Sequence, residues 1–446
     1  VINSILAGPG SLLDLPGGQN HLLDQILSKV SEKHRPLASE IATALIAAEG
    51  LNKSIIFANI LSQQTREGET LTEALVLKSL LDAYGAPGIK LAQYLAFTHE
   101  FAEFQNVLEV YQDSAMPISY FEAVRLITQR LGSSWDPLKY RVKSIIGSGS
   151  VNIAIELVEI ATGESLVVTV LRDNIEVKTK EDFRRFELLI SSLIRNPTNS
   201  LSLDGSHDSV RDRSNKKRFE FVTGLMGIIK KSVELEFDKK NAFEIQRQAT
   251  KLYHRNIGGW QVQTVEARGL TKGGLFMEKA PGEVARKVLH SQPEVYNSAM
   301  AALVEVEFGI LRGVSDSGNF IPLPLIANPD LHDGQVLLDV SNRIVTILDF
   351  GQALGISNLE RDFAIDLLRI VVGGEAPKRA KELLEKWSVE FKSKQVFSEL
   401  QIKEILAHGE RMDIFVHLIS MMETQGMSLP LSSIHWILAA NRLMIL

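Results

Sequence analysis

Asp330-Leu-His-Asp-Gly-Gln335 is followed by two short apolar runs, Val336–Leu338 and Ile344–Leu348, and then directly by Asp349-Phe-Gly351. The two runs are rich in Val, Ile and Leu, which predicts a hairpin of two short strands. The hairpin would carry an aspartate and an amide before its first strand and a second aspartate after its second strand. An aspartate that leaves a buried strand at a glycine turn suits a magnesium ligand on nucleotide phosphates. The order of these parts therefore predicts a catalytic loop and a metal-binding turn that act together.

A glycine-bearing turn lies much earlier in the chain, at Gly147-Ser-Gly-Ser-Val151. It separates the first two of three short runs that predict an antiparallel meander, namely Arg141–Ile146, Ile153–Ile160 and Ser165–Leu171. Backbone N–H groups in such a turn can approach phosphates that any Cβ would keep away. Taken alone the turn indicates little, because a G-x-G in a hairpin is more often only a turn. In the same chain as the later aspartates, it predicts a phosphate-binding loop.

The remaining pattern predicts an α+β protein. Gly18 to Arg130 shows helical spacing, and helices are also expected at about Lys180–Ile194, Phe221–Ile229 and Lys239–Tyr253, with further strands at Gln261–Ala267 and Leu275–Lys279. This order is typical of a two-lobed protein-kinase-like fold, with an antiparallel five-stranded N-lobe and a helical C-lobe, although other α+β folds share it. We expect a helical N-terminal extension over 1–138, an N-lobe over 139–281 with a mobile insertion at 196–217, and a C-lobe over 282–446.

The composition excludes several classes of function. The 446 residues include no cysteine, which excludes disulfides, thiolate catalysis and cysteine-ligated metals. A net charge of −6 argues against a nucleic-acid partner, and the basic stretch Arg211–Arg218 is interpreted as a solvated loop. The segment Val1–Asn20 does not resemble a signal peptide, and Leu429–Leu446 is too polar for the ~20-residue apolar run of a membrane helix. We expect an intracellular protein, soluble or peripheral to a membrane, with no transmembrane segment.

Several further motifs resemble those of the UbiB-type atypical kinases, a family related to coenzyme Q biosynthesis. Ala327-Asn-Pro-Asp-Leu-His-Asp-Gly-Gln335 is similar to the A-D-P-H-P-G-N loop of that family, and Asp349-Phe-Gly-Gln352 is similar to its D-F-G turn. Four other stretches resemble its K-x-G-Q, L-Q-D-x-x-P-P, E-x-D and hinge motifs, respectively Gly85-Ala-Pro-Gly-Ile-Lys-Leu-Ala-Gln93, Tyr111-Gln-Asp-Ser-Ala-Met-Pro117, Glu234-Leu-Glu236 and Met277-Glu-Lys-Ala-Pro-Gly282. The resemblance covers the chain from about Leu81 to its end.

The resemblance implies a nucleotide site for ATP and Mg²⁺, with the K-x-G-Q helices folded over it and Lys90 close to Glu234 and Glu236. It also implies a context of isoprenoid or quinone lipids, so a protein or isoprenoid-lipid partner is possible. The expected catalytic residues are Asp330, Lys240 and Lys90; the expected metal ligands are Asp349 and Gln335; and the expected nucleotide contacts are Gly147, Ser148, Gly149, Ser150, Val151, Thr169, Glu278, Ala280, Gln93, Glu234 and Glu236.

Four departures from the family pattern affect the expected activity. Thr169 replaces the strand lysine that grips the α- and β-phosphates, which should weaken phosphate binding by a few kcal/mol unless another group compensates. Lys240 aligns with the glutamate that pairs with that lysine, so either Lys240 or its neighbour Lys239 could reach the phosphates, or the pair has simply been lost. Gln335 replaces a metal-binding asparagine, and glycines replace alanines in the phosphate-binding loop.

Two functions remain open on the sequence. The first is an atypical kinase or ATPase that binds Mg-ATP and has weak or absent phosphotransfer. The second is a pseudokinase that binds a partner or a lipid as a regulatory module. The ten histidines include no H-E-x-x-H pair and the chain has no G-x-S-x-G elbow, so metal hydrolases and serine hydrolases are not favoured. His332 is expected to have a structural role in the catalytic loop.

Overall fold

A computed structural model describes residues 73–95, 118–195, 209–314, 321, 325–393, 395–407 and 411–443. These residues form a mixed α+β fold, and the chain divides into two compact units. Unit 1 comprises Val1–Tyr111 and Glu176–Lys230, and unit 2 comprises Gln112–Ile175 and Lys231–Leu446. The helices expected near residues 22–30 and 41–48 and the motif at 111–117 lie outside the described residues.

The described part of unit 1 is helical. It contains α5 (Glu73–Ala83), α6 (Ala86–Leu95), α9 (Ile175–Arg195) from Glu176 onward, and α10 (Ser209–Phe237) up to Lys230. The α5–α6 pair is tight, because a Cβ on Gly88 would overlap the carbonyl oxygen of Leu81. Tyr84 stacks on Phe186 of α9 at 4.4 Å between ring centroids. Helix α10 begins inside the segment Asn196–Lys217, so the loop predicted there is wrong from Ser209 onward.

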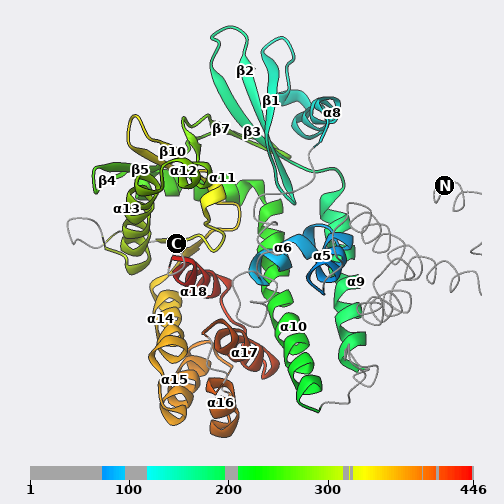
Figure 1. Cartoon of the computed structure of the whole chain (residues 1–446), viewed down its shortest axis with the longest axis vertical. Helices are drawn as coiled ribbons and strands as arrows, with labels where there is room; N and C mark the ends of the chain where they lie inside the picture. The colour runs from blue at the N-terminus through cyan, green and yellow to red at the C-terminus, as the bar shows by residue number, and fades with distance from the viewer. Residues whose placement is uncertain are drawn as a thin grey trace, which may run out of the picture. The chain divides into compact units, whose positions relative to one another are not determined.

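Unit 2 opens with an antiparallel sheet (Figure 1). Its strand order is β1-β2-β3-β7-β6. The strands are β1 (Tyr140–Ser148), β2 (Asn152–Glu159), β3 (Ser165–Leu171), β6 (Ala267–Leu270) and β7 (Gly274–Glu278). The predicted meander over the first three strands is confirmed, with the glycine turn between β1 and β2.

Two helices cover the two faces of this sheet. Helix α8 (Tyr120–Leu131) packs Leu126 and Ile127 against Ile153 and Ile155 of β2 and their neighbours on β3. Helix α11 (Lys239–Tyr253) contributes Ala242 to a cluster on the other face. Because strand residues alternate between faces, this second face also carries Ala154, Val167 and Thr169.

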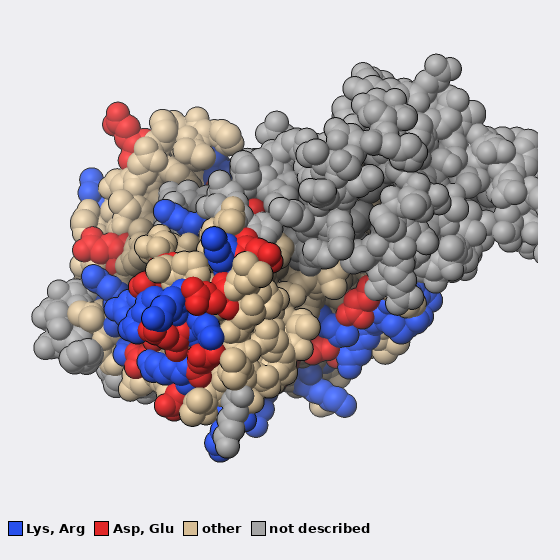
Figure 2. Space-filling model, turned by 90° about the horizontal axis from the view of Figure 1, so that it is seen from below, with Lys and Arg blue, Asp and Glu red and all other residues tan. Residues whose placement is uncertain are grey.

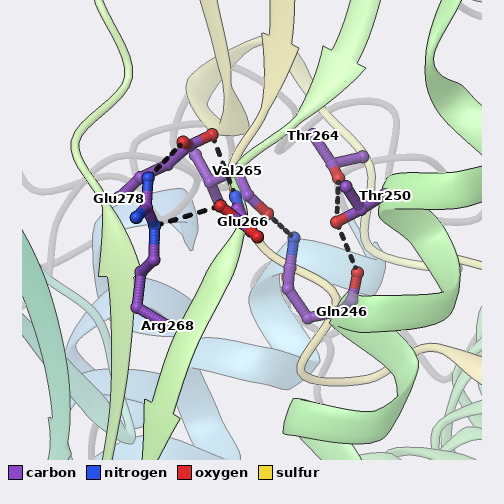
Figure 3. Close-up of polar contacts among 7 residues, drawn as sticks. All are labelled: Gln246, Thr250, Thr264, Val265, Glu266, Arg268 and Glu278. Atoms are coloured by element: carbon purple, nitrogen blue, oxygen red, sulfur yellow. Dashed lines mark hydrogen bonds and ion pairs between the residues drawn. The ribbon is translucent and has the colours of Figure 1, made fainter.

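The predicted strand Gln261–Ala267 is wrong as a single element. Its first part, β5 (Trp260–Thr264), pairs in parallel with β11 in a second sheet, whereas its last residue begins β6 of the first sheet. Helix α11 fixes this crossing, because Gln246 donates to the Val265 carbonyl at 2.8 Å and Thr250 contacts Thr264 at 3.3 Å (Figure 3). The second sheet has the order β4-β5-β11-β10-β8 and also contains β4 (Arg255–Ile257), β8 (Glu283–Val284), β10 (Val336–Asp339) and β11 (Ile344–Ile347).

The C-terminal part of unit 2 is mainly helical. Its helices are α12 (Ala285–Ser291), α13 (Pro293–Arg312), α14 (Asn358–Gly373), α15 (Pro377–Glu390), α16 (Glu399–Leu406), α17 (Arg411–Thr424) and α18 (Leu431–Leu443). Figure 2 shows basic and acidic side chains interspersed on one side of the molecule. On α15, ion pairs join Arg379 with Glu382 and Lys381 with Glu385. Among the described helices, none is long and apolar enough to cross a membrane.

Candidate functional site

A short ladder brings the two predicted aspartate turns together. Strand β9 (Leu325–Ala327) pairs antiparallel with β12 (Leu354–Ile356), so residues 328–353 form one closed loop around the β10–β11 hairpin. Asn328 joins the two turns, because its side chain accepts from the Asp330 N–H at 3.2 Å and donates to the Asp349 carbonyl at 3.0 Å. The predicted hairpin is confirmed. The ring of His332 accepts from the Gly334 N–H at 3.1 Å, which supports the structural role expected for it.

Asp330 is buried and is held by two amides. Its Oδ2 accepts from Nε2 of Gln335 at 3.4 Å and from Nε2 of Gln352 at 3.1 Å. The same amide group of Gln352 donates to Glu236 Oε1 at 2.7 Å. Gln352 therefore links Asp330 to α10, and it is 3% exposed, so water cannot replace its hydrogen bonds.

Asp349 is exposed at the end of the hairpin, and its Oδ1 accepts from the Gly351 N–H at 2.7 Å. Close to it in the same closed loop, Oε1 of Gln335 and Oε1 of Gln352 are buried and have no hydrogen-bond donor among the described residues. Magnesium prefers carboxylate and amide oxygens as ligands, so the Asp349 carboxylate and these two amide oxygens fit that ion. No cluster of three or more His, Cys, Asp or Glu side chains with metal-binding geometry occurs in the described part of the chain.

The glycine turn reaches the same network through Asn152, the first residue of β2. Its Nδ2 donates to Glu236 Oε2 at 3.4 Å, and its Oδ1 accepts from Nζ of Lys239. A continuous set of contacts therefore runs from the glycine turn through Glu236 and Gln352 to Asp330. All of these residues belong to unit 2.

Arg172 holds the glycine turn in shape. The Arg172 guanidinium donates to the Gly149 carbonyl at 2.8 Å and to the Ser148 hydroxyl. The backbone N–H of Arg172 donates to the Val151 carbonyl at 3.0 Å. The turn closes with a 2.8 Å hydrogen bond from the Gly149 N–H to the Asn152 carbonyl. The Arg172 carbonyl in turn accepts from Arg130 of α8, so the turn is anchored to the far end of β3 and to α8.

The structure separates the two candidate lysines of α11. Lys240 is exposed, whereas Lys239 is 6% exposed and contacts Asn152. Burial lowers the pKa of Lys239, the carboxylates of Asp349 and Glu236 act in the opposite direction, and Arg130 adds to the lowering. Glu244, one turn further on, is exposed. Lys239 thus contacts the residue that closes the glycine turn and lies within the electrostatic influence of Asp349.

Apolar side chains lie beside this polar network, between the first sheet and the β10–β11 hairpin. The buried members are Val167, Met277 and Ala280, and the partly exposed members that pack on them include Ala154, Leu337 and Leu348. Thr169 is half-buried on the same face of β3, opposite Ala154 of β2. An apolar surface next to a polar one is the usual composition of a small-molecule site.

The segment after β7 was expected to contact a nucleotide through Glu278 and Ala280. The Glu278 carboxylate is already occupied, because it accepts from the Glu266 N–H at 3.0 Å and pairs with Arg268 at 3.6 Å (Figure 3). The backbone N–H of Glu278 is also engaged, because it donates to the Glu266 carbonyl at 3.0 Å. Ala280 is 8% exposed within the apolar cluster.

The remaining expected residues are divided between the two units. Glu236 is buried in the network, and Glu234 is exposed. Lys90 is 5% exposed and Gln93 half-buried on α6 of unit 1, so a role for either of them at this site stays a prediction.

Three residues of the network were not assigned a role from the sequence, namely Asn152, Gln352 and Asn328. A signal existed for Asn152, because it occupies the last position of a G-x-G-x-x-G spacing that starts at Gly147. A signal also existed for Gln352, because it directly follows the Asp349-Phe-Gly351 turn. No family model matches this chain, and no curated protein matches it either.

Proposed function

We propose that unit 2 is a two-lobed, protein-kinase-like module of the UbiB type that binds Mg-ATP and has weak or absent phosphotransfer. The observation that carries the proposal is the set of contacts from Asn152 through Glu236 and Gln352 to Asp330. It joins a glycine turn to two aspartate turns about 180 residues later, in the order that kinases use for phosphate, acceptor and metal.

Each part of Mg-ATP has a candidate group. The apolar side chains of Ala154, Val167 and Leu337 would contact the base, and the Gly147–Val151 turn would cover the phosphates. Asp349 and the Oε1 of Gln335 would hold the magnesium ion, which would neutralise phosphate charge. Asp330 would orient an acceptor hydroxyl.

A second function, a pseudokinase without phosphotransfer, is favoured by two observations. Thr169 brings no charge to the position where kinases carry the strand lysine. Asp330 Oδ2 accepts from two amides, and such hydrogen bonds favour the ionised carboxylate and make it a weaker proton acceptor. The module would then bind a protein partner or an isoprenoid lipid, and the nucleotide would regulate that binding.

A thermal-shift titration with ATP, in the presence and absence of Mg²⁺, tests the proposal. We expect the melting temperature to rise only when ATP and Mg²⁺ are both present, because a ligand that binds the folded state stabilises it by mass action. Asp349→Asn should abolish the Mg²⁺-dependent part, because an amide is a neutral and weaker magnesium ligand.

Asp339→Asn is the matched control. Asp339 also accepts a backbone N–H, from Asn342 at 3.1 Å, but it lies at the opposite end of the hairpin. The control should keep the full shift. Absence of any shift at millimolar Mg-ATP, or an equal loss in both variants, would contradict nucleotide binding at this site.

A further inference from the structure

We infer that Lys239 supplies the positive charge that Thr169 does not, and that it binds the α- and β-phosphates of a nucleoside diphosphate or triphosphate from the first turn of α11. The inference rests on the proposed function and names a further ligand-binding residue for it. Kinases carry this charge on the third strand of the first sheet. Here that strand presents a threonine on the face that α11 covers, and α11 begins with a buried lysine.

The position of Lys239 is suited to phosphate binding. Its ammonium contacts Asn152, which closes the glycine turn, and it lies in the electrostatic field of Asp349, the expected magnesium ligand. Phosphates that the glycine turn covers and that a magnesium ion on Asp349 bridges would lie near both Asn152 and Asp349. A lysine placed there reaches them without moving its helix.

The bonding of Lys239 leaves it capacity for a ligand. An ammonium group has three N–H donors. In the described part of the chain, Lys239 makes one hydrogen bond, to the neutral amide oxygen of Asn152, and has no carboxylate within ion-pair distance. Burying a lysine without a paired anion is costly. A phosphate would provide the missing anion and would offset the cost of burying this lysine.

Asn152 has a defined part in this arrangement. It stands where a G-x-G-x-x-G loop has its third glycine, and its side chain bridges Lys239 and Glu236. Phosphate oxygens would accept from the remaining Lys239 donors, and Asn152 would keep its contacts with Lys239 and Glu236. The glycine turn then stays anchored when the phosphates bind.

Isothermal titration with Mg-ADP and with adenosine separates a phosphate contact from a structural one. Lys239→Met keeps the aliphatic stem and removes the charge. It should weaken Mg-ADP binding roughly 10- to 100-fold, the usual value of a charged hydrogen bond. Adenosine binding should change by less than about twofold, because adenosine has no phosphate. Lys239→Arg should recover part of the Mg-ADP affinity.

Lys251→Met on the exposed face of the same helix is the matched control and should bind as wild type does. Equal Mg-ADP affinity in Lys239→Met and wild type would overturn the inference, as would a loss confined to Lys240→Met. A parallel loss of adenosine binding would show a structural role and would overturn it as well. A wild-type chain that binds neither ligand would instead refute the proposed function.

Discussion

At the scale of single residues, Gln352 joins the two halves of the polar network. One amide group donates to two buried carboxylates, Glu236 and Asp330, that come from different parts of unit 2. Two acids held this closely repel each other when both are ionised, and a shared donor offsets that repulsion. The site thus depends on a neutral side chain whose partners are distant in sequence.

Gln352→Leu should destabilise the protein by about 2–4 kcal/mol, because it leaves two buried acceptors without their common donor. Gln401→Leu, at an exposed position of α16, should stay within about 0.5 kcal/mol of wild type. Urea unfolding followed by circular dichroism measures both. A Gln352→Leu variant as stable as the Gln401 control would show that the network does not stabilise the fold.

At the scale of elements, the start of α11 decides which lysine enters the site. Asp238 caps the helix by accepting from the N–H groups of Lys240 and Asn241, so Lys239 is its first residue. The buried positions Ala242, Ile245 and Ala249 then follow at helical spacing and place Lys239 on the same face. Lys240 is rotated by about 100° from that face.

Much of this element-scale structure could be predicted from the sequence. The cap and the apolar spacing of α11 are local patterns, as are the β1–β3 meander and the β10–β11 hairpin. The split of Gln261–Ala267 between two sheets was not predictable, because it depends on Gln246 of α11 and on pairing with β11, both distant in sequence. Asn152 and Gln352 were missed for the same reason, since their partners are far away along the chain.

The α5–α6 contact of unit 1 gives a matched pair of glycine substitutions. Gly88→Ala should cost at least about 2 kcal/mol, because its Cβ would overlap the Leu81 carbonyl group and one helix must move. Gly227→Ala in α10 should stabilise by about 0.5–1 kcal/mol, because its Cβ meets no atom within 4 Å among the described residues. Thermal unfolding measures both. Equal effects of the two substitutions would contradict the close approach of α5 and α6.

At the scale of the whole molecule, a buried acid couples stability to pH. Burial raises the pKa of Glu307 on α13 to about 8, and burial together with this carboxylate raises the pKa of Tyr253. Tyr253 also packs edge-on against Phe350, the residue after Asp349, with 5.2 Å between ring centroids. The protonation of Glu307 therefore affects the core that supports the site.

The folded state keeps the Glu307 proton up to about pH 8, whereas the unfolded chain loses it near 4.5. This contribution to stability is complete below pH 4.5 and is lost as the pH rises toward 8, by up to about 1.4 kcal/mol per pH unit. Glu307→Gln removes this dependence, so its stability relative to wild type should improve steadily from pH 5 to pH 8. Urea unfolding at several pH values measures the slope.

Glu305→Gln is the control for this prediction, because Glu305 lies exposed on the same helix. The difference in the free energy of unfolding between Glu305→Gln and wild type should be nearly constant with pH. The assignment fails if Glu307→Gln also shows a constant difference.

The ladder between β9 and β12 has a consequence for how the protein is made. The contacts of Asp330 with Gln335 and Gln352 span 5 and 22 residues, whereas Gln352 reaches Glu236 across 116. Short loops close at a small entropic cost, so the aspartate turns can form as soon as they are synthesised. The glycine turn and Lys239 leave the ribosome much earlier, because synthesis begins at the N-terminus. They remain without their partners until Gln352 has emerged, and a chain cut short before Asp330 would carry the glycine turn and Lys239 without either aspartate turn.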